Sequence, residues 1–168
     1  MLLLSSCGGG TDNAAVNVSP HVSQSENTSD SRELLKQVQG HIDAFEYNRA
    51  VKLIEENPGL CSSAEFDGVQ AALDEHFAGA AKDYHTAAMV YITRMVIDGF
   101  DYDTGFEGYD RESGTLDPGA IAENLPEALN KDELLITKRV TIECSGKAED
   151  TNVKVTVEYC GRTAVYPE

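Results

Sequence analysis

The hydrophobic pattern changes its period once along this 168-residue chain, and that change limits what the chain can fold into. Up to Ile97, apolar residues recur every three or four positions, as they do on one face of an α-helix. From Val140 onward they alternate with polar residues, which is typical of a β-strand with one buried face. We therefore predict an α+β domain, in which an acidic four-helix layer is followed by a C-terminal antiparallel β-hairpin.

Four helices are expected in residues 31–97. The first should begin at Asp30-Ser31-Arg32-Glu33, which has the spacing of a capping box, and Asn57-Pro58-Gly59 should end the second. Ser62-Ser63-Ala64-Glu65 opens the third helix in the same way. Gly79 separates the third helix from the fourth, whose broad apolar surface predicts packing on two sides.

The C-terminal part begins with an acidic connecting loop at residues 98–119. A short helix in residues 118–131 is expected to start at Asp117-Pro118. The hairpin follows, with a turn centred near Glu149 and Asp150, and residues 164–166 are expected to extend its second strand. The apolar faces of the two predicted strands consist of Val140, Ile142 and Cys144, and of Val153, Val155, Val157 and Tyr159.

The net charge of −16 is unevenly distributed. Residues 1–130 carry 7 basic and 22 acidic side chains, whereas residues 131–168 carry 6 and 7. Such a field repels nucleic acid and anionic lipid headgroups, and it favours basic partners or divalent cations. We expect no nucleic-acid partner.

A separate signal precedes the domain. Leu4-Ser5-Ser6-Cys7 is followed by Gly8-Gly9-Gly10 and resembles the lipobox of bacterial lipoproteins. The resemblance implies that Cys7 is acylated and becomes the mature N-terminus after residues 1–6 are removed. Since only six residues precede Cys7, either the leader begins upstream of Met1 or the sequence is a fragment.

The resemblance also implies a cellular location and a domain organisation. Residues 1–7 would form the anchor, residues 8–30 a disordered tether, and residues 31–168 a single globular domain. Gly8 after the cysteine resembles the pattern for sorting to the outer membrane. We expect a lipid-anchored protein of the bacterial cell envelope that faces the periplasm.

Three further cysteines, Cys61, Cys144 and Cys160, leave at least one thiol unpaired within the chain. The expected hairpin places Cys144 opposite Val155 and puts Cys144 and Cys160 on different faces, so a bond between them needs a bulge. A Cys144–Cys160 disulfide is nevertheless our preferred pairing, with Cys61 bonded to either partner as the alternative.

The acidic loop has two possible uses. The loop begins like a Ca²⁺-binding EF-hand loop, with candidate ligands at Asp101, Asp103 and Glu112. Phe106, however, occupies the position at which an EF-hand loop needs glycine. The alternative is an adhesive or simply solvated loop, with exposed aromatic residues: Phe100, Tyr102, Phe106 and Tyr109.

Two short segments, residues 46–51 and residues 83–88, look alike and each is expected to open a helix. They weakly resemble the second helix of a tetratricopeptide repeat.

No catalytic motif appears in the sequence, no two histidines have the spacing of a zinc pair, and we expect no cofactor. We predict a non-catalytic protein-interaction or envelope-assembly module; the alternatives are a cystatin-like small-ligand-binding domain, a Ca²⁺-binding protein and, more weakly, an enzyme.

Overall fold

The computed structural model describes residues 25–127, 129, 139–147 and 150–168. Within them the chain forms helices followed by an antiparallel sheet, which confirms the α+β class. The elements, in order, are α1 (Ser25–Asp43), α2 (Tyr47–Glu56), the 3-10 helix η1 (Pro58–Ser62), α3 (Phe66–Ile97), β1 (Tyr109–Asp110), β2 (Thr115–Leu116), the 3-10 helix η2 (Pro118–Asn124), β3 (Val140–Lys147), β4 (Asp150–Tyr159) and β5 (Arg162–Tyr166).

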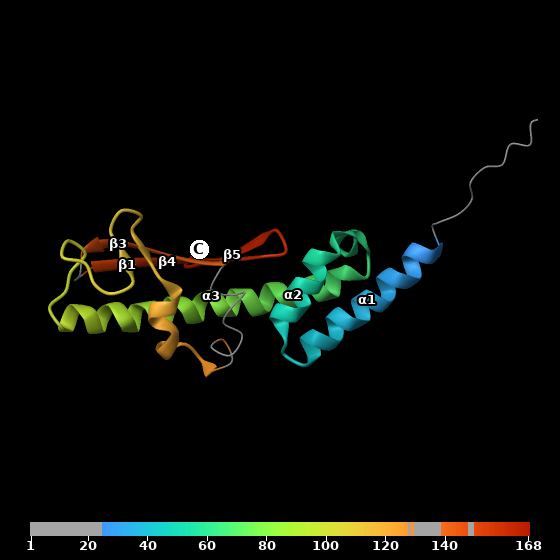
Figure 1. Cartoon of the computed structure of the whole chain (residues 1–168), viewed down its shortest axis with the longest axis horizontal. Coiled ribbons are helices and arrows are strands. Elements are labelled where there is room, and N and C mark those ends of the chain that lie inside the picture. The colour runs from blue at the N-terminus through green and yellow to red at the C-terminus, as the bar shows by residue number, and fades with distance from the viewer. Residues whose placement is uncertain (1–24, 128, 130–138, 148–149) are drawn as a thin grey trace, which may run out of the picture.

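Helix α3 is the axis of the molecule (Figure 1). Helices α1 and α2 lie beside its N-terminal part, while the sheet lies along its middle and C-terminal part. The start of α1 and the end of α3 are therefore at opposite ends of an elongated structure. At 1.5 Å per residue, the 32 residues of α3 alone extend about 48 Å.

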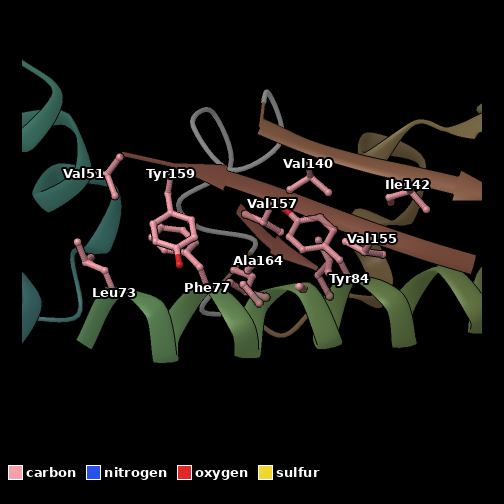
Figure 2. Close-up of a cluster of buried hydrophobic side chains, with 14 of the residues drawn as sticks. Val51, Leu73, Phe77, Tyr84, Val140, Ile142, Val155, Val157, Tyr159 and Ala164 are labelled. Carbon is pink, nitrogen blue, oxygen red and sulfur yellow. The ribbon is translucent and has the colours of Figure 1, made fainter. Parts of the chain in front are cut away.

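The sheet is an antiparallel meander in the order β1-β2-β3-β4-β5. Alternate residues of β3 and β4 point toward α3 and are buried, as their period-two pattern predicts. Figure 2 shows Tyr84 rising from α3 among the strand residues Val155 and Val157, and all three side chains are fully buried. The predicted core faces of the hairpin are confirmed.

The sheet is larger than the expected hairpin because of a tight turn after β4. Cys160 and Gly161 both have positive φ, at 46° and 73°, as the two central residues of a type I′ hairpin turn do. Residues 164–166 therefore lie in a separate strand, β5, instead of extending β4. The remaining two strands form a small hairpin inside the expected acidic loop.

Gly79 does not separate two helices, because α3 continues through it. A glycine in a helix interior costs about 1 kcal/mol relative to alanine. Phe77, Ala80 and Ala81 on either side are each no more than 2 % exposed, and their burial outweighs that cost. Residues 83–88 consequently lie inside α3 and do not open a helix, whereas Tyr47 does begin α2.

Several predicted boundaries are confirmed and one is shifted. Helix α2 ends at Glu56, just before Asn57-Pro58, and η2 begins at Pro118 with the Asp117 carboxylate accepting a hydrogen bond of 2.9 Å from the Gly119 backbone. Helix α1 begins at Ser25, inside the range expected to be tether. Among the described helices, none combines the length and apolar character needed to cross a bilayer.

Candidate interaction surface

The C-terminal end of α3 carries a group of exposed apolar side chains. Ile97 is 78 % exposed, Val90 is 47 % exposed and Phe100, just beyond the helix, is 46 % exposed. Val90 and Ile97 are seven residues apart and so lie on one stripe of the helix. We define the distal tip as these three side chains together with three neighbouring exposed carboxylates: Asp98, Asp101 and Asp103.

A helix-ending turn fixes Phe100 at this tip. The Gly99 backbone donates to the Val96 carbonyl and the Phe100 backbone donates to the Met95 carbonyl, both at 3.0 Å. This is the Schellman pattern, and Gly99 supplies the positive φ, +90°, that it requires. Three residues of chain reach at most about 11 Å, which limits the distance between the Cα atoms of Ile97 and Phe100.

The other aromatic residues of the acidic loop are turned inward. Tyr102, Phe106 and Tyr109 contact one another, with the rings of Phe106 and Tyr109 stacked at 4.9 Å. Tyr91 of α3 donates to the Glu107 carbonyl at 2.9 Å, which ties the loop to the helix. Of the four aromatic residues expected to be adhesive, only Phe100 is exposed.

The carboxylates of the loop mainly hold its turns. Asp101 accepts hydrogen bonds from the Thr104 backbone at 2.6 Å and from the Thr104 hydroxyl at 2.9 Å, and these bonds lower the pKa of Asp101. Asp110 binds the Ser113 hydroxyl and the Glu112 backbone, which lowers the pKa of Asp110 in the same way. Both groups therefore remain ionised at neutral pH.

The structure does not bring the predicted Ca²⁺ ligands Asp101, Asp103 and Glu112 together. Within the described residues, no three side chains of His, Cys, Asp or Glu are grouped closely enough to hold a metal ion. The physical reason is local, because Asp101 is already engaged in its own turn and Gly105 bends the chain one position before an EF-hand would.

At the end of the sheet nearest α2, polar bonds join the helices to the β4–β5 turn. Arg139 binds Glu55 of α2 with both guanidinium NH₂ groups, and the Glu55 carboxylate also accepts from the Cys160 backbone at 3.3 Å. The hydrogen bonds from Arg139 lower the pKa of Glu55 despite its partial burial. The pair is about 30 % exposed at each side chain, so it is only partly screened by solvent.

A second polar bond joins α3 to the same turn. Asp74 accepts from the Tyr159 hydroxyl at 2.7 Å and from Arg162 at 2.9 Å. Burial favours a raised pKa for Asp74, but the hydrogen bonds and the positive charge of Arg162 together lower it. Burial, followed by the bond to Asp74, raises the pKa of Tyr159 to about 12. The β4–β5 turn is thus held at two points.

An aromatic stack fills the space beside these bonds. The rings of Tyr47 and His76 are parallel at 3.5 Å, His76 meets Phe77 edge-on at 4.9 Å, and Phe77 stacks on Tyr159 at 4.3 Å. Figure 2 shows the last pair between α3 and β4. Burial in this stack lowers the pKa of His76 to about 4, so the imidazole is neutral at pH 7.

The three described cysteines, Cys61, Cys144 and Cys160, are free thiols. Cys144 lies opposite Val153 and not Val155, and seven strand residues, or about 23 Å, separate Val153 from Cys160. The structure therefore keeps the preferred pair well beyond the ~7 Å Cα separation that a disulfide tolerates. Burial raises the pKa of Cys144 to about 11 and that of Cys160 to about 12, the latter with contributions from Glu55 and then Cys61.

Three surface clefts lie on the described part of the chain. One of about 510 Å³ lies between α1 and η1, and another of about 330 Å³ lies between α1 and the start of α3. A third, of about 260 Å³, lies beside β2 and β3. None of the three contains the distal tip, which is a projection of the surface.

The distal tip was missed by the reasoning from the sequence, and Cys7 lies outside the described residues. The broad apolar face of the helix predicted packing on two sides, whereas Val90 is exposed. The signal in the sequence that could have indicated the tip is the break in the helical spacing of apolar residues after Tyr91, where apolar Ile97 and Phe100 are interleaved with charged residues.

Comparisons with protein-family models, curated proteins and solved structures find no match to this chain.

Proposed function

We propose that this protein is a lipid-anchored, non-catalytic protein-interaction module of the bacterial cell envelope. The observation that carries the proposal is the distal tip, an exposed apolar group at one end of α3. Contiguous exposed apolar side chains with polar neighbours mark surfaces that bind other proteins. Its partner would be another protein of the envelope.

The position of the tip supports this role. Cys7, the proposed acylation site, precedes α1 in sequence, and α1 begins at the end of the molecule far from the tip (Figure 1). A chain anchored through Cys7 can therefore present the tip away from the bilayer. Two or more acyl chains on one residue give stable membrane attachment, which a single chain does not. We place the protein at the outer membrane, facing the periplasm.

One observation favours the alternative of a cystatin-like small-ligand binder. Such a domain needs more strands than one hairpin, and the sheet has five. The space between sheet and helix is filled, however, by Phe77, Tyr84 and Val155, which are each no more than 2 % exposed. A ligand would have to displace these side chains or bind in a surface cleft, so the interaction role is better supported.

Membrane fractionation and intact-protein mass spectrometry test the anchor. The chain is expressed with a complete lipoprotein leader, as wild type, as Cys7→Ser and as Cys61→Ser. We expect the wild type and Cys61→Ser, which alters an exposed cysteine of the domain, to carry a diacylglyceryl group and to sediment with membranes. Cys7→Ser should be unmodified. Unmodified wild-type protein in the soluble fraction would contradict the proposal.

A further inference from the structure

The apolar part of the distal tip is surrounded by negative charge. Between Arg94 and Arg111 the chain carries five carboxylates and two basic residues, Arg94 and Arg111, and the positive charge of Arg111 contributes to lowering the pKa of Asp101. Asp98, Asp101 and Asp103 are exposed and lie within six residues of Ile97 in the sequence. The hydrogen bonds of Asp101 to Thr104 keep that charge in place at neutral pH. The surface therefore combines exposed apolar area with a rim of carboxylates.

This combination restricts what can cover the tip. A purely apolar partner would remove water from the carboxylates without pairing them, which is costly. A purely basic partner would pair the carboxylates and leave Ile97 and Phe100 in water. An anionic bilayer or a nucleic acid would be repelled by the same charges. A partner with apolar residues flanked by Lys or Arg satisfies both requirements.

We propose that the distal tip binds a basic amphipathic segment of a partner protein, in which Lys or Arg residues flank an apolar stripe. The inference rests on the proposed interaction role, whose membrane anchor is tested separately. The apolar stripe covers Ile97 and Phe100 and supplies most of the affinity. The basic residues face the carboxylates, so they mainly set the rate of association and the selectivity against acidic partners.

Synthetic peptides provide the probe. A fluorescent peptide of about 18 residues, with Leu and Lys at the spacing of an amphipathic helix, is titrated with the full 168-residue chain carrying Cys7→Ser. One comparison peptide replaces every Lys with Glu, and another replaces every Leu with Ser. We expect saturable binding of the Leu–Lys peptide alone, weakened severalfold between about 50 and 300 mM NaCl.

Three variants locate the binding site. Ile97→Ser with Phe100→Ser should weaken binding roughly tenfold or more, and Asp98→Asn with Asp103→Asn should weaken it severalfold and reduce its salt dependence. Phe45→Ser is the matched control, because Phe45 is 77 % exposed and lies between α1 and α2, far from the tip. It should bind as the wild type does. Circular dichroism confirms that each variant is folded.

The outcomes separate the possibilities. Equal binding of the acidic or the Leu-free peptide, or equal weakening by Phe45→Ser, would overturn the proposal. Association of the chain with phosphatidylcholine vesicles, lost in Ile97→Ser with Phe100→Ser, would assign the tip to a bilayer instead. A membrane-bound protein that binds none of the peptides would leave the anchor standing while refuting this inference.

Discussion

Helices α1 and α3 end in the same turn but place different residues in it. In α1 the Phe45 backbone donates to Ile42 and the Glu46 backbone donates to His41, and in α3 Gly99 and Phe100 occupy the equivalent places. The position that requires positive φ holds Phe45 in one turn and Gly99 in the other. The following position holds an ion-paired Glu46 in α1 and exposed Phe100 in α3.

The comparison shows that exposure alone does not identify a binding surface. Phe45 and Ile97 are almost equally exposed, at 77 % and 78 %. Phe45 is a single side chain beside the Tyr47 ring and the Glu46–Arg49 ion pair, with His41 hydrogen-bonded to Glu46, in a region joined by polar bonds to the sheet. Ile97 has exposed apolar neighbours and a rim of carboxylates. Grouping, more than exposure, distinguishes the two ends.

The largest expected effect concerns two apolar residues of α3 with opposite environments. Phe77→Ala should lower the free energy of unfolding by about 3–5 kcal/mol, because it opens a cavity beside Tyr159. Ile97→Ala should change it by less than about 0.5 kcal/mol. Urea unfolding at neutral pH measures both. A loss above about 1 kcal/mol for Ile97→Ala, twice that bound, would mean that the tip is part of the core.

The next effect is acid destabilisation through His76. Burial lowers the pKa of His76 from 6.5 to about 4, so the unfolded chain takes up the proton first as the pH falls. The associated stability is complete above the unfolded pKa of 6.5 and is lost toward about 4. Between about pH 7 and pH 5 the loss should reach at most about 2 kcal/mol. Urea unfolding at the two pH values measures it.

His76→Gln provides the control for that experiment. The variant keeps a planar polar side chain against Tyr47 but does not titrate in this range. Its stability should fall clearly less than that of the wild type over the same interval. An identical loss in both proteins would show that other groups titrate and that His76 is not held neutral.

A smaller effect is expected from the Glu55–Arg139 pair. A double-mutant cycle with Glu55→Gln and Arg139→Gln should give a coupling energy of about 1 kcal/mol, because the pair is bidentate and partly buried. The same cycle on Arg32 and Glu65, which are 70 % and 55 % exposed, should give less than about 0.5 kcal/mol. Similar values for the two pairs would mean that partial burial and bidentate geometry do not strengthen the Glu55–Arg139 pair.

The sign of the pH dependence is a second check on this pair. Arg139 lowers the pKa of Glu55, so the stability from the bond is present above the ordinary value of 4.5. This contribution to stability is lost as the pH falls through the lowered pKa of Glu55. The wild type should therefore lose more stability in acid than Arg139→Gln does.

The smallest effect is a gain in stability from Phe45→Gly. Phe45 has a φ of 60°, which disfavours a bulky side chain by about 1 kcal/mol, and glycine adopts this conformation without that cost. The edge contact with Tyr47 is lost in exchange. We expect a net gain of about 0.5 kcal/mol in thermal or urea unfolding. A clear loss would mean that Phe45 contributes to the stack around His76.

Reasoning from the sequence succeeded where one local signal dominates. The alternation in residues 140–144 and 153–159 predicted the core face of the sheet, and Asn57-Pro58 predicted the end of α2. It failed where packing overrides propensity, as at Gly79, and where an uncommon residue occupies a turn, as at Cys160. The distal tip was missed because a helical stripe does not show which of its residues a later sheet will cover.

Site-specific photocrosslinking in intact cells tests the central claim most directly. A photoreactive phenylalanine analogue is placed at position 97 or at position 45 of the protein, expressed with a complete lipoprotein leader. The two positions are almost equally exposed, and position 45 lies in the turn between α1 and α2, away from the distal tip. We predict a discrete adduct with an envelope protein from position 97, reduced by Asp98→Asn with Asp103→Asn, and none from position 45. Adducts from position 45 alone, or the same adducts from both positions, would contradict the account.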